Sequence, residues 1–458
     1  MGDLSAYVSR EALIKSLQNL TGKSDVRLLD DYKVEKATSG LEGFTSLVLR
    51  VNLNYSIPGD EDIKHHTLFV KSMSPMDYQR EISKDSKVFL KESLYFTKAM
   101  PVMNKVSAGR VPLPLAACFY AIDDSDKAAF YMEDLVYSGY RSADRSQLFD
   151  GLDLPHCTLV MKALGRLHAI SLAAEKTLDS GKGSWIKSYP DFDRDYFYYV
   201  AGPGERPPVL HKTIESSIEN IKELCREIEG LPQEAAASGA LDKVLEGAWP
   251  TICRLKTTPT GKCRVLTHGD CWMNNMMFRY KKKTEEDEEE PVDVKLYDLQ
   301  MAKVCHPGID LLYFLYINTR RRFRENYFTS LIDLYYESLT VSLMFLDGSS
   351  PPFSLSELKT DLLGYYKTFG VLVATFFSPM MLLGDQLMLP NSDDMTPEKM
   401  EELYNTGSAP IIAYRFRNDE KYRSKVEDIF REFVEVALPN GVQSVNSSPL
   451  LCQKSVEK

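Results

Sequence analysis

The sequence lacks paired cysteines and any metal-binding cluster of histidine and cysteine. Its 8 cysteines are scattered over 458 residues, none forms a C-x-x-C pair, and no cluster has the spacing of a zinc site. The N-terminus has no basic region followed by an apolar segment, so we expect no secretory signal. Scattered cysteines in a long chain are typical of a reduced, intracellular protein, and we expect a cytoplasmic location.

Negatively charged residues outnumber positively charged ones, and long apolar runs are scarce. The formal net charge of −10 argues against a general nucleic-acid or anionic-membrane binder. The most apolar run, from Phe369 to Leu383, is too short to span a membrane and contains Pro379. We interpret it as a buried helix of a large lobe, and we infer no nucleic-acid, membrane or protein partner.

The most informative stretch is residues 265–278, which is apolar, then polar, then apolar, as a strand, a tight loop and a second strand would be. Asp270 and Asn275 lie five residues apart in this loop, and a later apolar strand delivers Asp298. One aspartate can take a proton from a hydroxyl, while the other and the asparagine hold Mg²⁺ on a nucleoside triphosphate. The alternative is a hairpin whose polar residues only satisfy the backbone of a turn.

Residues from about 31 to 72 predict three antiparallel strands, and segments 111–120 and 129–132 add two more to make a five-stranded sheet. Gly40 and Gly43 lie in the turn between the first two strands, shortly before Ser46. Such a turn can place backbone N–H groups over phosphates, although most hairpins with two glycines are plain turns.

A helix predicted between Ser83 and Met100 carries Glu92 on its apolar face, and we expect Pro101 to end it. A carboxylate among buried side chains needs a cation, and Lys71 ends the preceding strand. A Lys–Glu pair between a strand and the next helix positions nucleotide phosphates in kinase-like folds. The alternative is a glutamate that reaches solvent at the edge of the helical face.

The segment Glu133-Asp134-Leu135 leaves the last strand for a connector with a glycine, and we interpret it as a hinge whose backbone meets an adenine edge. Beyond it the pattern is mostly helical, and we interpret His168 as a packed or capping histidine rather than a catalytic one. The tail lacks periodicity and is expected to be disordered. The predicted parts are an N-terminal helical extension (1–30), a nucleotide-binding lobe (31–135), a helical lobe with the catalytic loop and substrate cleft (136–438) and the tail (439–458).

Together these pieces resemble the choline/aminoglycoside kinase branch of the protein-kinase-like superfamily. The loop has His-Gly-Asp in place of His-Arg-Asp, and the segment Pro307–Leu311 follows Asp298 within about a dozen residues, which leaves no room for a long activation loop. The narrower resemblance is to the ecdysteroid kinase-like family of insect proteins, over about residues 30–320. It is carried by Leu68-Phe69-Val70-Lys71, Phe89-x-x-Glu92, Glu133-Asp134-Leu135, His268-Gly269-Asp270-x-Trp272-x-Asn274-Asn275-x-x-Phe278, Asp298-x-Gln300 and Pro307-x-x-Asp310-Leu311.

The resemblance implies an α+β, two-lobed, protein-kinase-like fold, with a five-stranded antiparallel sheet and a helix in the first lobe and a mostly helical second lobe. It also implies that ATP and Mg²⁺ serve to phosphorylate a hydroxyl of a small-molecule alcohol, an ecdysteroid or a similar lipophilic or xenobiotic compound. The roles it carries over are a catalytic base at Asp270, magnesium ligands at Asn275 and Asp298, cofactor contacts at Lys71, Glu92, Gly40, Gly43, Ser46, Glu133 and Leu135, and structural support of the catalytic loop by His268 and Asp310.

The glycine turn departs from the family pattern, because Leu41 stands where a small residue is expected and Gly43 where a polar one is expected. Two other functions remain open at this point. A choline or ethanolamine kinase would hold a cation with acidic and aromatic groups. A pseudokinase-like protein would bind a lipophilic ligand without turnover.

Overall fold

The computed structural model describes residues 4–37, 46–124, 127–181, 183–205, 207–231, 239–259, 261–282, 284, 288–384 and 408–438. Contacts divide the chain into two compact units, of which unit 1 is Met1–Ser142 with Asn274–Ala302, and unit 2 is Ala143–Met273 with Lys303–Lys458. Unit 1 therefore includes residues 1–30, which the sequence pattern assigns to a separate extension. It also includes residues 274–302, which the pattern assigns to the helical lobe. The predicted tail lies outside the described residues.

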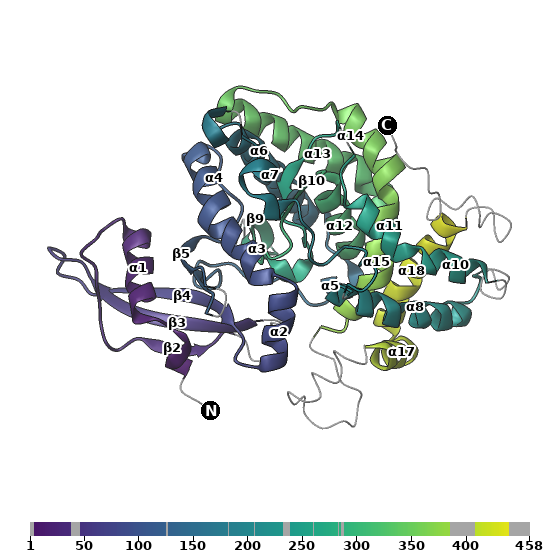
Figure 1. Cartoon of the computed structure of the whole chain (residues 1–458), viewed down its shortest axis with the longest axis horizontal. Helices are drawn as coiled ribbons and strands as arrows, with labels where there is room; N and C mark the ends of the chain where they lie inside the picture. Colours follow the sequence, from purple (N-terminus) through teal and green to yellow (C-terminus); the bar gives the residue numbers. More distant parts are fainter. Residues whose placement is uncertain are drawn as a thin grey trace. The chain divides into compact units, whose positions relative to one another are not determined.

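Unit 1 is an antiparallel sheet with helices and a separate hairpin (Figure 1). Its elements are η1 (Leu4–Tyr7), α1 (Arg10–Thr21), β1 (Arg27–Leu28), β2 (Lys33–Lys36), β3 (Ser46–Ser56), β4 (Lys64–Met73), α2 (Asp77–Asp85), α3 (Val88–Leu94), η2 (Tyr95–Ala99), α4 (Met100–Ser107), β5 (Cys118–Ile122), β6 (Ala129–Glu133), β8 (Met276–Lys281) and β9 (Glu290–Leu296).

The sheet has the strand order β1-β3-β4-β6-β5, and β2 also pairs with β3. Leu49, Val51 and Leu53 alternate along β3 on a buried face, as the two-residue period of a strand requires, and belong to a core that includes Leu13 and Leu17 of α1. The predicted five strands are all present, and the two-residue β1 adds a sixth.

The fourth predicted strand, 111–120, begins later than its apolar pattern suggests. Only Cys118–Ile122 forms β5, because Pro112 and Pro114 cannot donate to a ladder. The residues before β5 instead lie along β9, where Ala116 N donates to Leu296 O at 2.9 Å.

The prediction that Pro101 ends the helix was wrong. The helix passes from α3 through the π-helical turn η2 into α4, and Pro101 lies in the first turn of α4. Proline lacks an N–H and its ring crowds the carbonyl four residues back, so a regular α-helix would be broken here. The wider turn, in which Met100 N donates to Tyr95 O, accommodates it.

Unit 2 is mostly helical. Its elements are α5 (Gln147–Asp150), α6 (Leu154–Glu175), η3 (Leu178–Gly181), α7 (Trp185–Ser188), η4 (Pro190–Phe192), α8 (Val209–Glu227), α10 (Ala240–Glu246), α11 (Ala248–Leu255), β7 (Val265–Thr267), β10 (Lys303–Cys305), α12 (Gly308–Asn318), α13 (Arg321–Asp347), α14 (Leu355–Asp361), η6 (Leu362–Tyr366), α15 (Lys367–Met381), α17 (Ala409–Asn418) and α18 (Glu420–Ala437). A further 3₁₀ turn, η5 (Met273–Asn275), lies where the chain passes from unit 2 to unit 1.

The core of unit 2 is built around α6, α12, α13 and α15 (Figure 1). Every residue of α12 is buried. Gly165 lets α6 approach α13 closely, since a Cβ there would lie 2.7 Å from Tyr335 O. Helix α6 is long and apolar enough to span a membrane by composition, but 78% of that stretch is buried inside the protein, as in a core helix.

The apolar run 369–383 lies mainly in α15, where the predicted buried helix is confirmed. With an antiparallel sheet in unit 1 and helices in unit 2, the predicted α+β fold class is also confirmed.

Candidate active site

Unit 1 brings together three of the predicted site residues. Lys71 on β4 places its Nζ 2.6 Å from Glu92 Oε2 on α3 and 2.8 Å from Asp298 Oδ1, just after β9. The side chains of Lys71 and Glu92 are 9% and 1% exposed, whereas that of Asp298 is 24% exposed. Burial alone would lower the pKa of Lys71, but the two carboxylates outweigh it and raise that pKa above its ordinary value.

The second oxygen of Glu92 fixes the backbone next to Asp298. Leu299 N donates to Glu92 Oε1 at 3.1 Å. Asp298 itself has a φ of 66°, in the left-handed region that aspartate and asparagine tolerate better than other side chains. Lys71 and Glu92 thus hold both the side chain and the following amide of Asp298, so the carboxylate is preset in a strained position.

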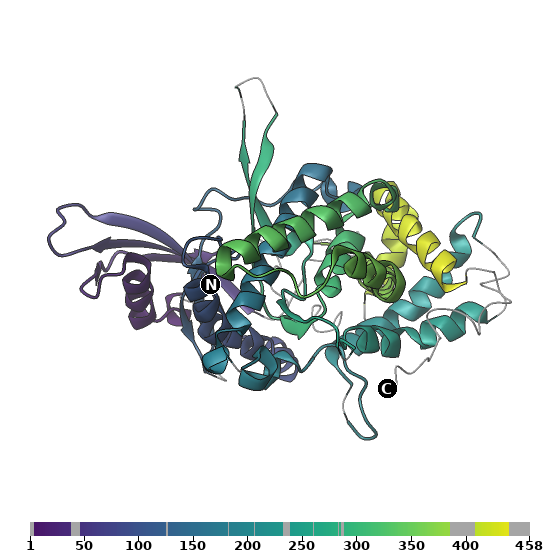
Figure 2. The ribbon, with the colours of Figure 1, turned by 90° about the horizontal axis from the view of Figure 1, so that it is seen from above.

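Asn275 and Asp298 lie at the same end of the β8–β9 hairpin, whose strands run side by side (Figure 2). Met276 pairs with Leu296, and Tyr297 N donates to Asn275 O at 3.0 Å. The two residues therefore flank the last paired positions of this ladder. An amide oxygen and a carboxylate are hard oxygen donors that suit Mg²⁺.

The described residues contain no group of three or more His, Cys, Asp or Glu side chains that could hold a metal ion. A magnesium ion at Asn275 and Asp298 would therefore take its other ligands from water and from phosphate oxygens, which is how Mg²⁺ is usually bound at nucleotide sites. Asn275 and Asp298 therefore suit a magnesium ion that arrives bound to the nucleotide better than one that the protein binds permanently.

In the predicted hinge, the Glu133 side chain has partners within the protein, whereas the backbone of Leu135 has an N–H without one among the described residues. The Glu133 carboxylate is occupied by Lys295 Nζ, at 2.6 and 2.7 Å, and by Ala117 N. The Leu135 carbonyl accepts from Tyr140 N at 2.8 Å, whereas the Leu135 N–H has no acceptor in the part of the chain that the structure describes. Leu135 is 6% exposed, and a backbone N–H without an acceptor suits the acceptor atom of a ligand.

The glycine turn cannot be placed, because Gly40 and Gly43 lie outside the described residues. Ser46 is buried at the start of β3, where it pairs with Met73. Its predicted contact with phosphate stays a prediction.

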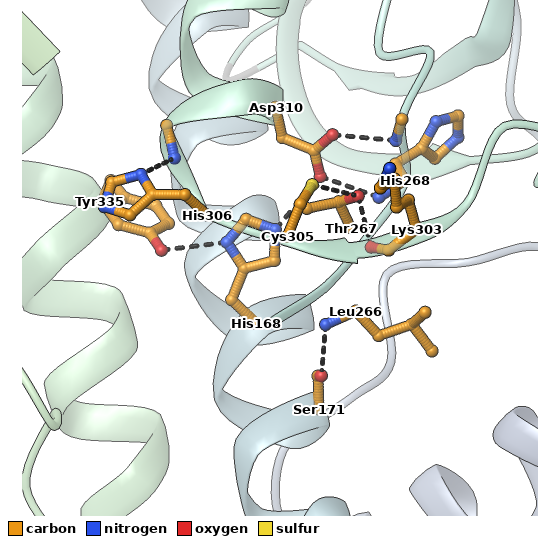
Figure 3. Close-up of polar contacts among 12 residues, drawn as sticks. His168, Ser171, Leu266, Thr267, His268, Lys303, Cys305, His306, Asp310 and Tyr335 are labelled. Atoms are coloured by element: carbon orange, nitrogen blue, oxygen red, sulfur yellow. Dashed lines mark hydrogen bonds and ion pairs between the residues drawn. The ribbon is translucent and has the colours of Figure 1, made fainter. Parts of the chain in front are cut away.

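Unit 2 contains the start of the catalytic loop, directly after β7. The buried carboxylate of Asp310, in the first turn of α12, accepts from His268 N at 2.7 Å and from Gly269 N at 2.8 Å (Figure 3). Asp270 N in turn faces His268 Nδ1 at 3.3 Å. Asp310 therefore fixes the two peptide groups that precede Asp270.

His168 on α6 supports Asp310 from the other side (Figure 3). Its Nε2 lies 3.1 Å from Asp310 Oδ2, and its Nδ1 lies 2.9 Å from the hydroxyl of Tyr335 on α13. Burial alone would raise the pKa of Asp310, but the hydrogen bond from His168, together with Gly269 N–H, brings it below its usual value. The carboxylate is therefore ionised where it holds the loop.

Two further residues of α12 contact the loop, and the sequence pattern did not single them out. Tyr313 donates its hydroxyl to Asp270 Oδ1 at 2.6 Å. Asn318 accepts from Met273 N at 2.7 Å and donates to Cys271 O at 3.1 Å. Helix α12 therefore holds the loop at its start, at Asp270 and at its end.

Helical spacing could have identified Tyr313, which follows Asp310 by three residues and so lies on a neighbouring part of the helix surface. Asn318 had no such signal, because an asparagine near a helix end is ordinarily a cap. The interpretation of His168 as packed agrees with its complete burial, but its contact with Asp310 could not be read from the sequence. The catalytic, metal and cofactor roles of all these residues stay predictions.

The comparisons with known proteins bear on the family. The model of the ecdysteroid kinase-like family matches residues 40–347, and no curated protein matches the sequence. Among solved structures, a protein assigned as a fructosamine-3-kinase from Haemophilus somnus 129PT shares 11% identity, over 94% of this chain and 100% of that one. Its TM-score of 0.34 is too low to support an argument.

The family match covers more than half of the 458 residues. It includes Lys71, Glu92, Asp298 and the whole catalytic loop. The chain therefore belongs to the ecdysteroid kinase-like family of small-molecule kinases.

Proposed function

We propose that this protein transfers the γ-phosphoryl group of Mg·ATP to a hydroxyl group of a lipophilic alcohol, with an ecdysteroid as the first candidate. The observation that carries the proposal is the triad of Lys71, Glu92 and Asp298, in which a buried cation is shared by two carboxylates of different exposure. Such a triad is costly to bury and has a direct use in holding phosphates and a metal ion.

The residues of unit 1 bind and orient the nucleotide. Lys71 contacts the α- and β-phosphates, Glu92 holds Lys71, and Asn275 with Asp298 ligates Mg²⁺. When bound, Mg²⁺ supplies neutralisation of charge on the phosphate oxygens. Leu135 N–H donates to an acceptor on the adenine edge, which would give this donor the acceptor it lacks in the described structure.

Asp270 orients the acceptor hydroxyl and takes its proton as the hydroxyl oxygen bonds to the γ-phosphorus, while the bond from that phosphorus to the bridging oxygen breaks and ADP leaves. Positioning contributes most of the rate in such transfers, since they need little covalent chemistry from the protein. Tyr313 keeps Asp270 in one orientation. Burial, with the nearby Asp270 charge, raises the pKa of Tyr313 well above its usual value, so the phenol stays protonated and donates.

The test is Mg²⁺-dependent ATP consumption by the purified protein with a panel of alcohols that includes ecdysone, a phenolic glucoside and choline. Asp270→Asn should lower turnover by about 10²–10⁴-fold, the usual worth of a general base, while ATP binding is kept. Asp293→Asn, outside the site, is the control.

Three outcomes contradict the proposal in different ways. Turnover of choline alone would show that the acceptor is a cationic alcohol and not a lipophilic one. Undiminished turnover by Asp270→Asn would remove the assignment of the base. Absence of ATP consumption with every alcohol, together with tight binding of one of them, would make the protein a ligand-binding member of the family.

A further inference from the structure

A small cavity of unit 2 lies against the catalytic loop. Trp272 and Met273 of the loop line it together with the ends of α5, α12 and α15, and it leaves about 10 Å³ for a water-sized group. Asn318, which holds the loop backbone on both sides of Trp272, also lines the cavity. A group bound here would therefore contact the segment that carries Asp270.

Two buried polar atoms of the cavity lining have no hydrogen-bond partner among the described residues, Ser378 Oγ and Gln147 Oε1. Ser378 is 1% exposed. Serine and threonine in helices usually bond back to the preceding turn, as Thr375 of the same helix does to Val371 O at 2.8 Å. An unpaired buried hydroxyl is costly, so a ligand or a water is expected beside it.

Trp272 adds an unused donor. The indole N–H groups of Trp185 and Trp249 donate to backbone carbonyls at 3.0 and 3.1 Å. That of Trp272 meets no acceptor in the described part of the chain, and its side chain is half-buried. Trp272 is also a residue of the family motif to which neither the nucleotide nor the transfer step gives a role.

The chemistry of the lining is neutral. None of the nine residues around the cavity is ionisable, and most are apolar, including Met381 and Leu382. An apolar wall with a few polar groups recognises an uncharged molecule with hydroxyl groups. A quaternary ammonium would be desolvated here without a carboxylate to compensate, and a carboxylate ligand would lack a cation.

We propose that this cavity is a subsite for the acceptor, which takes one hydroxyl group of a neutral alicyclic alcohol whose ring stays outside the cavity. The hydroxyl donates to Gln147 Oε1 and accepts from Ser378, while the apolar body of the molecule packs on Trp272. The inference rests on the proposed function, because it assumes that the acceptor binds beside Asp270. It adds the recognising residues and excludes cationic acceptors.

The test is equilibrium dialysis of ecdysone against the full-length protein without nucleotide, so that binding is measured apart from transfer. Ser378→Ala removes the hydroxyl and Gln147→Met removes the carboxamide, and each should weaken binding about threefold to tenfold, the contribution of one neutral hydrogen bond. Thr375→Val, which removes a hydroxyl from the same helix away from the cavity, should bind as the wild type does. Choline should not compete.

Unchanged ecdysone affinity in both variants, or no binding to the wild type, would overturn the subsite. A change in thermal stability alone would show that the cavity holds only a water. The proposed function fails separately: weakened binding in the variants without ATP consumption by the wild type would keep the subsite and remove the kinase. Trp272→Phe keeps an aromatic ring beside the cavity and removes the indole N–H, so its ecdysone affinity measures the contribution of that N–H.

Discussion

Tyr313 donates its hydroxyl to Asp270 across 2.6 Å, from a helix in which every residue is buried. A donor fixed this rigidly keeps the carboxylate of Asp270 in one orientation. The core of unit 2 therefore orients Asp270, the proposed base, before any ligand binds.

Tyr313→Phe should lower kcat by about tenfold or more, because a hydrogen bond to a charged group contributes about 1.5–3 kcal/mol. The KM for ATP should not change, since Tyr313 bonds to Asp270 and is not among the residues proposed to bind the nucleotide. Steady-state kinetics of both substrates measure the split. Tyr336→Phe, whose hydroxyl bonds to Phe353 O, is the matched control, and an equal loss in both variants would contradict the role of Tyr313.

Lys71→Met should lower the free energy of unfolding by about 3–5 kcal/mol, because Glu92 and Asp298 would lose their buried counter-ion. The double variant Lys71→Met/Glu92→Leu should recover much of that stability and still fail to bind ATP. Urea unfolding and calorimetric titration with ATP separate the two effects. ATP binding by the double variant at wild-type strength would rule out the phosphate contact.

Asp310→Asn should destabilise the protein by about 3–5 kcal/mol, because the buried carboxylate serves His168 and two backbone amides at once. The control is Asp347→Asn, which breaks an ion pair with the half-exposed Lys176 and should cost less than about 1 kcal/mol. Urea unfolding at neutral pH compares them, and similar losses would argue against a supporting role for Asp310.

His306 should make stability depend on pH. Burial lowers its pKa to about 4, an effect that Asp361 only partly opposes, and its Nδ1 accepts from Gly308 N at 3.0 Å. Between about pH 6.5 and 4 the unfolded state binds more protons at this position, so stability falls as pH falls through that window. The full effect is on the order of 3 kcal/mol.

His306→Gln should remove that part of the loss. Urea unfolding of both proteins at pH 7, 5.5 and 4.5 measures it. Relative to its own stability at pH 7, the wild type should lose more stability at pH 5.5 and 4.5 than His306→Gln does. Parallel curves over the whole range would show that His306 does not titrate as its burial requires.

The sequence predicted what depends on local pattern and on charge. Alternation identified the strands, and the cost of a buried carboxylate led from Glu92 to Lys71, 21 residues earlier. It could not predict the π turn before Pro101, because that turn depends on how the helix packs. Pro112 and Pro114 did indicate that β5 begins after them, but the apolar pattern around them favoured a longer strand.

The candidate site was predictable only where a motif concentrates it. Asp270, Asn275 and Asp298 lie at fixed spacings, whereas the contacts of His168 and Asn318 join segments up to 167 residues apart. Tertiary packing decides such contacts, and no local preference marks them. The cavity beside Trp272 has the same origin, because three helix ends and the loop form it together.

The left-handed backbone of Asp298 limits how this protein can change. Asparagine shares the tolerance of aspartate for that conformation, whereas β-branched and bulky residues do not. Asp298→Asn would keep the fold of the β9 exit and remove the charge that a metal ion needs. A single nucleotide change in the gene could therefore turn a transferase of this family into a folded binding protein.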